Sequence, residues 1–200
     1  MTIHLILGGA RSGKSSYAEK QAKLSESTAM AQVHYLATGQ ALDEEMTARI
    51  TKHQQQRPAH WQLTEAAISI AGEIMQLIQA HQSQHQENIT IIVDCLTLWL
   101  TNCLCAKKQS CWQHEKQALL ALLTEYESTD KVTLLLVSNE VGHGIVPMGE
   151  LSREFVDQAG WLHQEIAEIA TQVDFIMAGI PLTLKGKSLK GQSLKEQGKR

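Results

Sequence analysis

Residues 8–15, GGARSGKS, decide the fold of this 200-residue chain. Four of them fit the pattern G-x-x-x-x-G-K-[ST], namely Gly8, Gly13, Lys14 and Ser15. An apolar run at residues 3–7 precedes the loop, and SSYAEKQAKL at residues 15–24 can form a helix after it. A strand, a glycine loop and a helix in this order predict a phosphate-binding loop; the alternative is a chance glycine turn before a helix.

The residue types of this loop suit a nucleoside triphosphate. Glycines let the backbone curl around a phosphate without Cβ clashes, so that successive backbone N–H groups and the positive end of the following helix face the anion. We expect Lys14 to reach the β- and γ-phosphates and the Ser15 hydroxyl to ligate Mg²⁺. The loop predicts that a triphosphate is held, but not what is done with it.

Short apolar runs recur along the chain and predict strands. Most are continuous rather than alternating, which is typical of strands covered on both faces. They are Ile3–Leu7, Val33–Ala37, Ile89–Val93, Val132–Val137 and Val173–Ala178. Helical patterns lie between them, so we expect an α/β fold with a mainly parallel sheet flanked by helices. WQLT at residues 61–64 can add a short strand outside this alternation.

Length and composition favour one domain. Two hundred residues with 43% apolar content suit a single core, and we assign residues 1–185 to one nucleotide-binding catalytic domain. From Lys185 onward the chain has six basic residues and one acid, so residues 186–200 are predicted to be a basic, mobile tail. Such a tail can attract nucleic acid, but basic and aromatic residues are not interleaved, and we expect no nucleic-acid partner.

Nothing in the sequence predicts secretion or a membrane span. The start, MTIHLILGG, lacks the basic leader and cleavage site of a signal peptide, and no run approaches ~18 consecutive apolar residues. Four cysteines form no pair of CxxC motifs and are expected to be reduced thiols: Cys95, Cys103, Cys105 and Cys111. A metal site that they share with His114 is the alternative. We therefore predict a cytoplasmic protein.

Polar side chains follow two of the predicted strands. Asp94 ends the run ITIIVD, where a carboxylate beside a phosphate loop is placed to hold Mg²⁺, directly or through water. The alternative is that Asp94 caps the helix suggested by LTLWLTNCL, and the two roles are compatible. Asn139 and Glu140 follow LLLVS at a similar strand end. They either contact substrate or metal, or simply begin a polar loop.

A histidine lies between two arginines in RITKHQQQRPAHW, residues 49–61. Arg49 and His53 are four apart in a helical pattern, which places both on one face. Arg57 precedes Pro58, so the helix should end near it and leave Arg57 free to approach the same ligand. Guanidiniums bind phosphate oxygens, and a neutral imidazole between them can attack a phosphorus atom. From these residues alone, an exposed helical face with an ordinary histidine is favoured.

Several motifs coincide, and the chain resembles the bifunctional adenosylcobinamide kinase/adenosylcobinamide-phosphate guanylyltransferase family of cobalamin biosynthesis. The likeness rests on GGARSGKS (8–15), YLATGQ (35–40), DEEMTARI…H…RPAHW (43–61), TE (64–65), DCLTLWLTN (94–102) and SNEVGHGIVP (138–147). Phosphate loops are shared by many enzymes, whereas the ordered set, with RIxxHxxxRP after the loop, is specific. This resemblance reverses the preference against His53.

The resemblance implies a RecA-like P-loop fold and two reactions. In the first, ATP or GTP phosphorylates the terminal hydroxyl of adenosylcobinamide. In the second, GMP passes from GTP to a histidine with release of pyrophosphate, and then to adenosylcobinamide phosphate, giving adenosylcobinamide-GDP. His53 matches the histidine that carries GMP. The nearest alternative is a plain small-molecule P-loop kinase, and a more distant one is a nucleotide-dependent binding switch.

The resemblance also implies nucleotide contacts and an oligomer. The matching positions are Gly8, Gly9, Ala10, Arg11, Ser12, Gly13, Lys14, Ser15, Ala37, Thr38, Gly39, Gln54, Gln55, Gln56, Arg57, Glu65 and Asp94. We expect Ser15 and Asp94 to hold Mg²⁺. The three consecutive glutamines are unusually uniform for their place in the motif, so contacts there are expected to come from the backbone. Members of the family form homotrimers.

Overall fold

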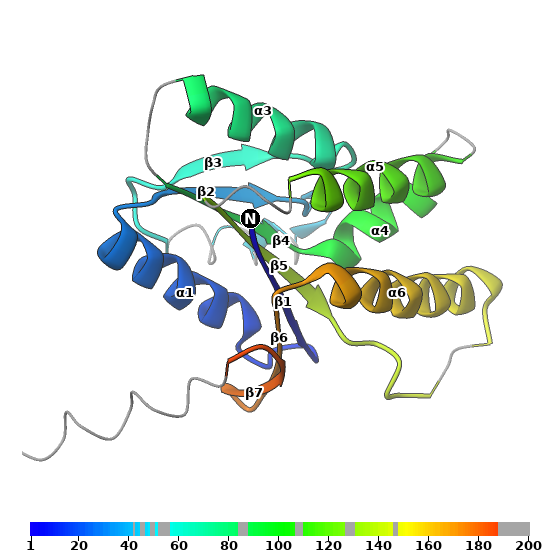
Figure 1. Ribbon diagram of the computed structural model, residues 1–200. Helices are drawn as coiled ribbons and strands as arrows, with labels where there is room; N and C mark the ends of the chain where they lie inside the picture. The colour runs from blue at the N-terminus through cyan, green and yellow to red at the C-terminus, as the bar shows by residue number, and fades with distance from the viewer. Residues whose placement is uncertain are drawn as a thin grey trace, which may run out of the picture.

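The computed structural model describes residues 1–41, 43–44, 47–48, 51, 57–83, 88–106, 110–126, 131–145 and 148–187. Within these residues, seven strands form one sheet in the order β3-β2-β4-β5-β1-β6-β7 (Figure 1). The strands are β1 (Thr2–Gly8), β2 (Gln32–Ala37), β3 (Gln62–Glu65), β4 (Ile89–Asp94), β5 (Val132–Asn139), β6 (Gln172–Met177) and β7 (Ile180–Lys185). All neighbours are parallel except β6 and β7. The predicted mainly parallel sheet is therefore confirmed.

The five predicted apolar runs are β1, β2, β4, β5 and β6. Their continuous pattern arises because helices cover both faces of the sheet. On β1, for example, Ile3, Leu5 and Leu7 belong to the core on one face, and Ile6 belongs to the core on the other. The WQLT stretch contributes β3, which pairs in parallel with β2 at one edge.

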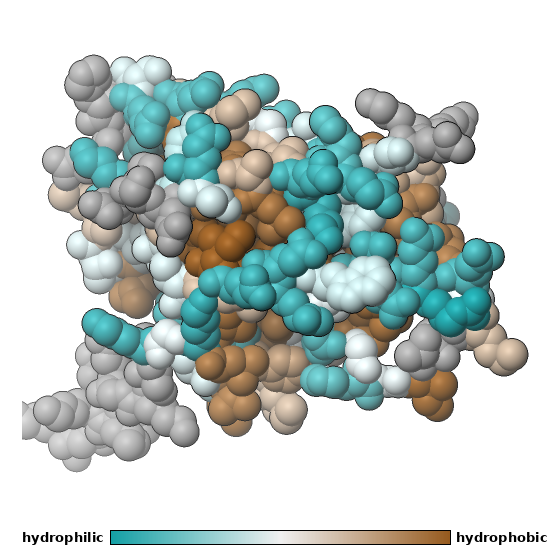
Figure 2. All heavy atoms as spheres, turned by 45° about the vertical axis from the view of Figure 1, so that its right-hand side comes forward, coloured by the Kyte–Doolittle hydropathy of each residue, from teal (hydrophilic) through white to brown (hydrophobic). Residues whose placement is uncertain are grey.

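Strand β7 was not among the predicted strands. It returns antiparallel to β6 after the turn Ala178–Gly179, whose two residues have φ of 51° and 78°. Positive φ at both positions is the geometry of a tight hairpin turn. Pro181 is tolerated because β7 is an edge strand. Three apolar side chains of β7 stay exposed, namely Ile180, Leu182 and Leu184. Figure 2 shows hydrophobic areas of the surface in brown, one of them at the height that β7 has in Figure 1.

Helices cover the two faces unequally (Figure 1). Among the described helices, α1 (Lys14–Ala29) supplies the buried side chains on one face, through Tyr17, Ala18 and Ala22. The larger core lies on the other face, beneath α3 (Ile70–Ser83), α4 (Leu96–Leu104), α5 (Cys111–Glu125) and α6 (Glu150–Ile169). None of the helices that the structure describes is long and apolar enough to cross a bilayer.

A buried carboxylate fastens α1 to the sheet. Asp174 on β6 is fully buried, and its Oδ2 accepts hydrogen bonds from the Tyr17 hydroxyl on α1 (2.7 Å) and from Gln172 Nε2 (2.9 Å). His4 Nε2 on β1 lies 2.8 Å from the same oxygen. Burial by itself would raise the pKa of Asp174, but these hydrogen bonds outweigh burial and hold the pKa well below its usual range. The network fixes the helix that follows the phosphate loop.

The carboxyl ends of the parallel strands form the edge at which a ligand site is expected in such sheets. The phosphate loop follows β1 at this edge, and the polar residues Asp94 and Asn139 end β4 and β5. Strand β5 lies between β1 and β4, pairing Asn139 with Gly8 and Val137 with Asp94. Asp94 therefore stands two strands away from the start of the loop.

Candidate active site

The phosphate loop connects β1 to α1 in a conformation that requires its two fixed glycines. A Cβ on Gly8 would lie 2.6 Å from the backbone oxygen of Ile176, and Gly13 has a φ of 96°. The loop closes through a hydrogen bond from the Ser12 amide to the Gly9 carbonyl (3.2 Å). The turn before β7 supports it from outside, because the Gly179 amide donates to the Ser12 carbonyl (2.8 Å).

Lys14 is the first residue of α1 and lies over the loop. It is 8% exposed, and its Nζ donates to the Gly9 carbonyl (3.1 Å). Its positive charge also acts on the Cys95 thiol, next to Asp94. Burial raises the pKa of the Cys95 thiol and the negative charge of Asp94 raises it further, whereas the positive charge of Lys14 acts against them. Lys14 and Asp94 therefore both lie within electrostatic reach of Cys95, the residue that follows β4.

The Asp94 carboxylate is held by a tyrosine from the neighbouring strand. The Tyr35 hydroxyl on β2 donates to Asp94 Oδ2 over 2.5 Å. Burial and then the charge of Asp94 raise the pKa of Tyr35 well above its usual value, so the hydroxyl stays protonated and keeps donating. The N-cap of α4 is Cys95, not Asp94. The alternative role of Asp94 as a helix cap is therefore wrong.

Arg57 joins this cluster from a distant part of the sequence. Its guanidinium carbon lies 3.3 Å from the centre of the Tyr35 ring, a cation–π contact. Its Nε is buried and has no hydrogen-bond partner among the described residues. Glu19 on α1 lies close enough for both charges to act on it: burial raises its pKa, Arg57 lowers it, and Asp94 raises it. Tyr35 thus contacts both Arg57 and the Asp94 carboxylate at the end of β4.

The predicted nucleotide contacts Ala37–Gly39 and Glu65 lie at the ends of β2 and β3, on the side of Asp94 away from the phosphate loop. Thr38 is fully buried and joins the ends of β2 and β4, because its hydroxyl donates to the Cys95 carbonyl and accepts from the Cys95 amide, both over 2.8 Å. Its side chain therefore faces the protein. A cavity of about 480 Å³ lies beside it, lined by Ala37, Gly39, Gln40, Ala41, Glu65, Ala66 and Ala67.

The end of β5 supplies a second carboxylate. Glu140 directly follows Asn139, and its amide donates to the Gly8 carbonyl (3.0 Å) at the start of the loop. Its Oε1 accepts from the Gly142 amide (2.6 Å). Its Oε2 is 3.7 Å from Nδ1 of His163, too far for a hydrogen bond. Burial lowers the pKa of His163 more than Glu140 raises it, so this ring is neutral at pH 7.

Several predicted site residues lie outside the described residues. These are His53, Arg49 and the run Gln54, Gln55 and Gln56. The role of His53 therefore stays a prediction. The structure does describe the chain just after this segment: His60 Nε2 lies 2.6 Å from Oε1 of Glu26, and the Trp61 indole N–H donates to Oε2 of the same residue (3.4 Å). The chain after Arg57 is thus anchored to α1 through His60 and Trp61.

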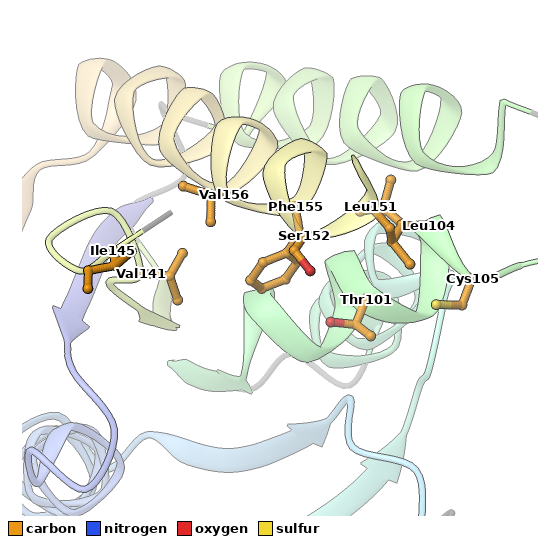
Figure 3. A pocket seen from close by; sticks show the side chains of 9 residues that line it. All are labelled: Thr101, Leu104, Cys105, Val141, Ile145, Leu151, Ser152, Phe155 and Val156. Carbon is orange, nitrogen blue, oxygen red and sulfur yellow. The ribbon is translucent and has the colours of Figure 1, made fainter. Parts of the chain in front are cut away.

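An apolar groove opens beyond the end of β5 (Figure 3). Its volume is about 400 Å³, and its walls come from α4, from the chain after β5 and from α6. The lining residues are Thr101, Leu104, Cys105, Val141, Ile145, Leu151, Ser152, Phe155 and Val156. None of these residues was a predicted site residue, since no local pattern joins three segments so far apart in the sequence.

Comparison with known proteins gives a consistent result. The profile of the family described as cobinamide kinase / cobinamide phosphate guanyltransferase matches residues 4–184. The bifunctional adenosylcobalamin biosynthesis protein CobP of Pseudomonas aeruginosa is 46% identical over 185 residues, covering 92% of this chain and 98% of that protein. The bifunctional adenosylcobalamin biosynthesis protein CobU of Escherichia coli K12 is 36% identical over 190 residues, covering 90% and 98%.

Solved structures with little sequence identity share the fold. One solved ATPase domain superposes with a TM-score of 0.54 at 13% identity, covering 87% of this chain and 68% of that one. A protein of Pyrococcus horikoshii OT3, studied under the project name PH0250, gives a TM-score of 0.54 at 10% identity, covering 94% and 88%. Together with the loop after β1, these likenesses confirm the predicted RecA-like P-loop fold.

Proposed function

This chain belongs to the cobinamide kinase / cobinamide phosphate guanyltransferase family, and from that membership we propose that one phosphate loop serves two transfers. In the first, adenosylcobinamide is phosphorylated by ATP or GTP. In the second, GMP passes from GTP through His53 to adenosylcobinamide phosphate. The observation that carries the proposal is the position of Arg57, which leads from the His53 segment directly to Tyr35 and Asp94 beside the loop.

The kinase reaction takes place at the γ-phosphate. The loop amides of Gly8–Ser15 and the Lys14 ammonium bind the triphosphate, with Lys14 on its β- and γ-phosphates. The hydroxyl oxygen of adenosylcobinamide bonds to the γ-phosphorus, the bond to the β–γ bridging oxygen breaks, and a nucleoside diphosphate leaves. Glu140, at the strand end that contacts Gly8, takes up the hydroxyl proton.

Two oxygen donors fit a divalent cation beside the loop. Ser15 is half-buried one residue after Lys14, and the half-buried Asp94 carboxylate lies at the end of β4, two strands away from the strand that leads into the loop. Hydroxyl and carboxylate oxygens are the ligands that Mg²⁺ prefers, and it commonly keeps several waters. When bound, Mg²⁺ offsets the negative charge of the phosphates. Tyr35 holds Asp94 in place for this role.

The guanylyl transfer takes place at the α-phosphate. A nitrogen of neutral His53 bonds to the α-phosphorus, the bond to the α–β bridging oxygen breaks, and pyrophosphate leaves. An oxygen of adenosylcobinamide phosphate then bonds to the same phosphorus, the phosphorus–nitrogen bond breaks, and the neutral imidazole is restored. Arg57 offsets charge on the transferring group. The nucleotide contacts Ala37–Gly39, Gln54–Arg57 and Glu65, and the cavity beside the end of β2 supports the first and last of these contacts.

Labelling with GTP that carries the radioactive phosphorus at the α-position tests this proposal. Wild-type protein incubated without a corrinoid is expected to become covalently labelled, and the label should be lost in acid, as phosphoramidates are. His53→Ala protein should take up no label and still phosphorylate adenosylcobinamide. A wild-type protein that phosphorylates the corrinoid but never takes up label would instead be a plain small-molecule kinase.

Three further assignments accompany the proposal. Residues 1–185 act as one catalytic domain, and the tail beyond them, of which residues 186 and 187 are described, takes no part in either transfer. The enzyme works in the cytoplasm, where its nucleotide substrates are made. It assembles as a homotrimer, for which the exposed apolar side chains of β7 offer a contact surface. Sedimentation equilibrium of the full chain measures the assembly directly.

A further inference from the structure

The apolar groove is built from the segments that immediately follow the two strand ends of the site. One wall is α4, which begins two residues after Asp94. The second wall, Val141 and Ile145, follows Glu140 at the end of β5, and α6 closes the groove from the opposite side. In Figure 3 the Val141 and Ile145 side chains mark the end of the groove nearest to β1, from which the phosphate loop starts.

This position places the groove on the γ-phosphate side of the loop. Lys14 is expected to reach the β- and γ-phosphates, and the proposed Mg²⁺ ligand Asp94 ends β4, two strands away from the start of the loop; we therefore place the terminal phosphate towards β4 and β5. An acceptor attacks in line, from the side opposite the leaving nucleotide, and must therefore arrive from beyond those two strands. The Glu140 amide contacts Gly8, which ties the second wall of the groove to the loop itself.

The lining of the groove suits an apolar ligand with amide groups at its edge. Most of its side chains are aliphatic or aromatic, with Phe155 half-buried in its floor. Polar atoms are few and are weak or neutral: the Thr101 and Ser152 hydroxyls and the Cys105 thiol. The Thr101 hydroxyl already donates to the Thr97 carbonyl (3.0 Å), so it offers lone pairs to an N–H donor. No lining side chain carries a charge, which disfavours a phosphate as the occupant.

We propose that this groove binds the corrinoid acceptor, with the apolar edge of the corrin ring between α4 and α6 and the aminopropanol arm directed past Glu140 to the phosphate loop. At about 400 Å³ the groove holds part of the ligand, and its lining residue Ile145, which is 98% exposed, continues the apolar lining to the surface. The inference rests on the proposed kinase function and adds the site of its acceptor.

Filling the groove from two walls tests the assignment. Thr101→Trp adds bulk from α4 and Ser152→Trp adds bulk from α6, and neither position is fully buried. Glu154→Trp is the matched control, because Glu154 is exposed on α6 and does not line the groove. The wild type and the three variants are compared by steady-state phosphorylation of adenosylcobinamide, by equilibrium dialysis of cobinamide followed through the visible absorbance of the corrin, and by labelling from α-labelled GTP without corrinoid.

Both groove variants are expected to raise the KM for adenosylcobinamide and the Kd for cobinamide by about tenfold or more, with the KM for the nucleotide unchanged. Labelling from GTP should stay at the wild-type level, and Glu154→Trp should match wild type throughout. Corrinoid KM and Kd within about twofold of wild type in both groove variants would overturn the assignment. So would unchanged corrinoid binding together with a changed sedimentation coefficient, which would identify a self-association surface. A wild-type protein that phosphorylates no corrinoid would instead defeat the proposed function itself.

Discussion

The two halves of the site are built in different ways. The phosphate loop is local: eight consecutive residues, two required glycines and backbone amides between one strand and one helix. The half around Asp94 is assembled from separate segments, with Tyr35 from β2, Arg57 from the chain before β3 and Thr38 from the end of β2. The loop is expected to anchor the triphosphate, whereas the proposed roles of the carboxylate and guanidinium of the assembled half differ between the two transfers. Substitutions in the two halves should therefore affect the rates of the two transfers differently.

The largest effect is expected in the local half. Lys14→Ala removes the ammonium that lies over the loop, so both transfers should lose activity by about 10²–10³-fold, the usual cost of removing one preorganised donor. The measurement is kcat/KM for phosphorylation and the rate of labelling from α-labelled GTP. Loss of only one of the two would show that the transfers do not share the loop. Unchanged circular dichroism serves as the control for folding.

Glu140→Gln should affect the kinase reaction alone. The amide keeps the shape of the side chain but cannot accept the hydroxyl proton, so phosphorylation should slow by about 10²-fold. Labelling of His53 from GTP involves no acceptor hydroxyl and should proceed at the wild-type rate. Equal losses in both assays would mean that Glu140 supports the loop through the Gly8 contact rather than taking part in proton transfer.

Thr38→Val is expected to weaken the assembled half through stability. The substitution keeps the shape of a fully buried side chain but leaves the amide and carbonyl of Cys95 without their hydroxyl partner. The free energy of unfolding should fall by about 1–3 kcal/mol, as measured by urea denaturation. Thr38→Ser retains the hydroxyl and should lose less. Equal losses in the two variants would assign the effect to packing instead.

The smallest predicted effect separates the two contacts of Tyr35. Tyr35→Phe loses the hydrogen bond to Asp94 but keeps the ring under Arg57, so the metal-dependent kinase rate should fall by about tenfold with little change in labelling. Tyr35→Leu also removes the aromatic face, a contact of about 0.5–2 kcal/mol, and labelling should then fall as well. Both rates are followed against Mg²⁺ concentration. Indistinguishable labelling in the two variants would show that Arg57 does not depend on the ring.

Prediction from the sequence succeeded where the determinants are local. The five apolar runs became strands because a continuous run between helical patterns is buried on both faces. Strand β7 was missed because its sequence, IPLTLK, contains a proline and leaves three apolar side chains in solvent, so only its pairing with β6 defines it. Asp94 was predicted as a site residue, yet its partner Tyr35 was not, since nothing local in YLATGQ shows that the hydroxyl faces another strand.

By itself, the sequence determined the parallel sheet, the phosphate loop and the family to which the chain belongs. These depend on the order of residues along short stretches of the chain. There the backbone conformation of the loop and the spacing of buried residues allow few structures. Only the tertiary structure decided that Arg57 lies on Tyr35, that Thr38 faces the protein and that α4 and α6 enclose a groove. Such contacts join residues distant along the chain, so they exist only once the strands are ordered in the sheet.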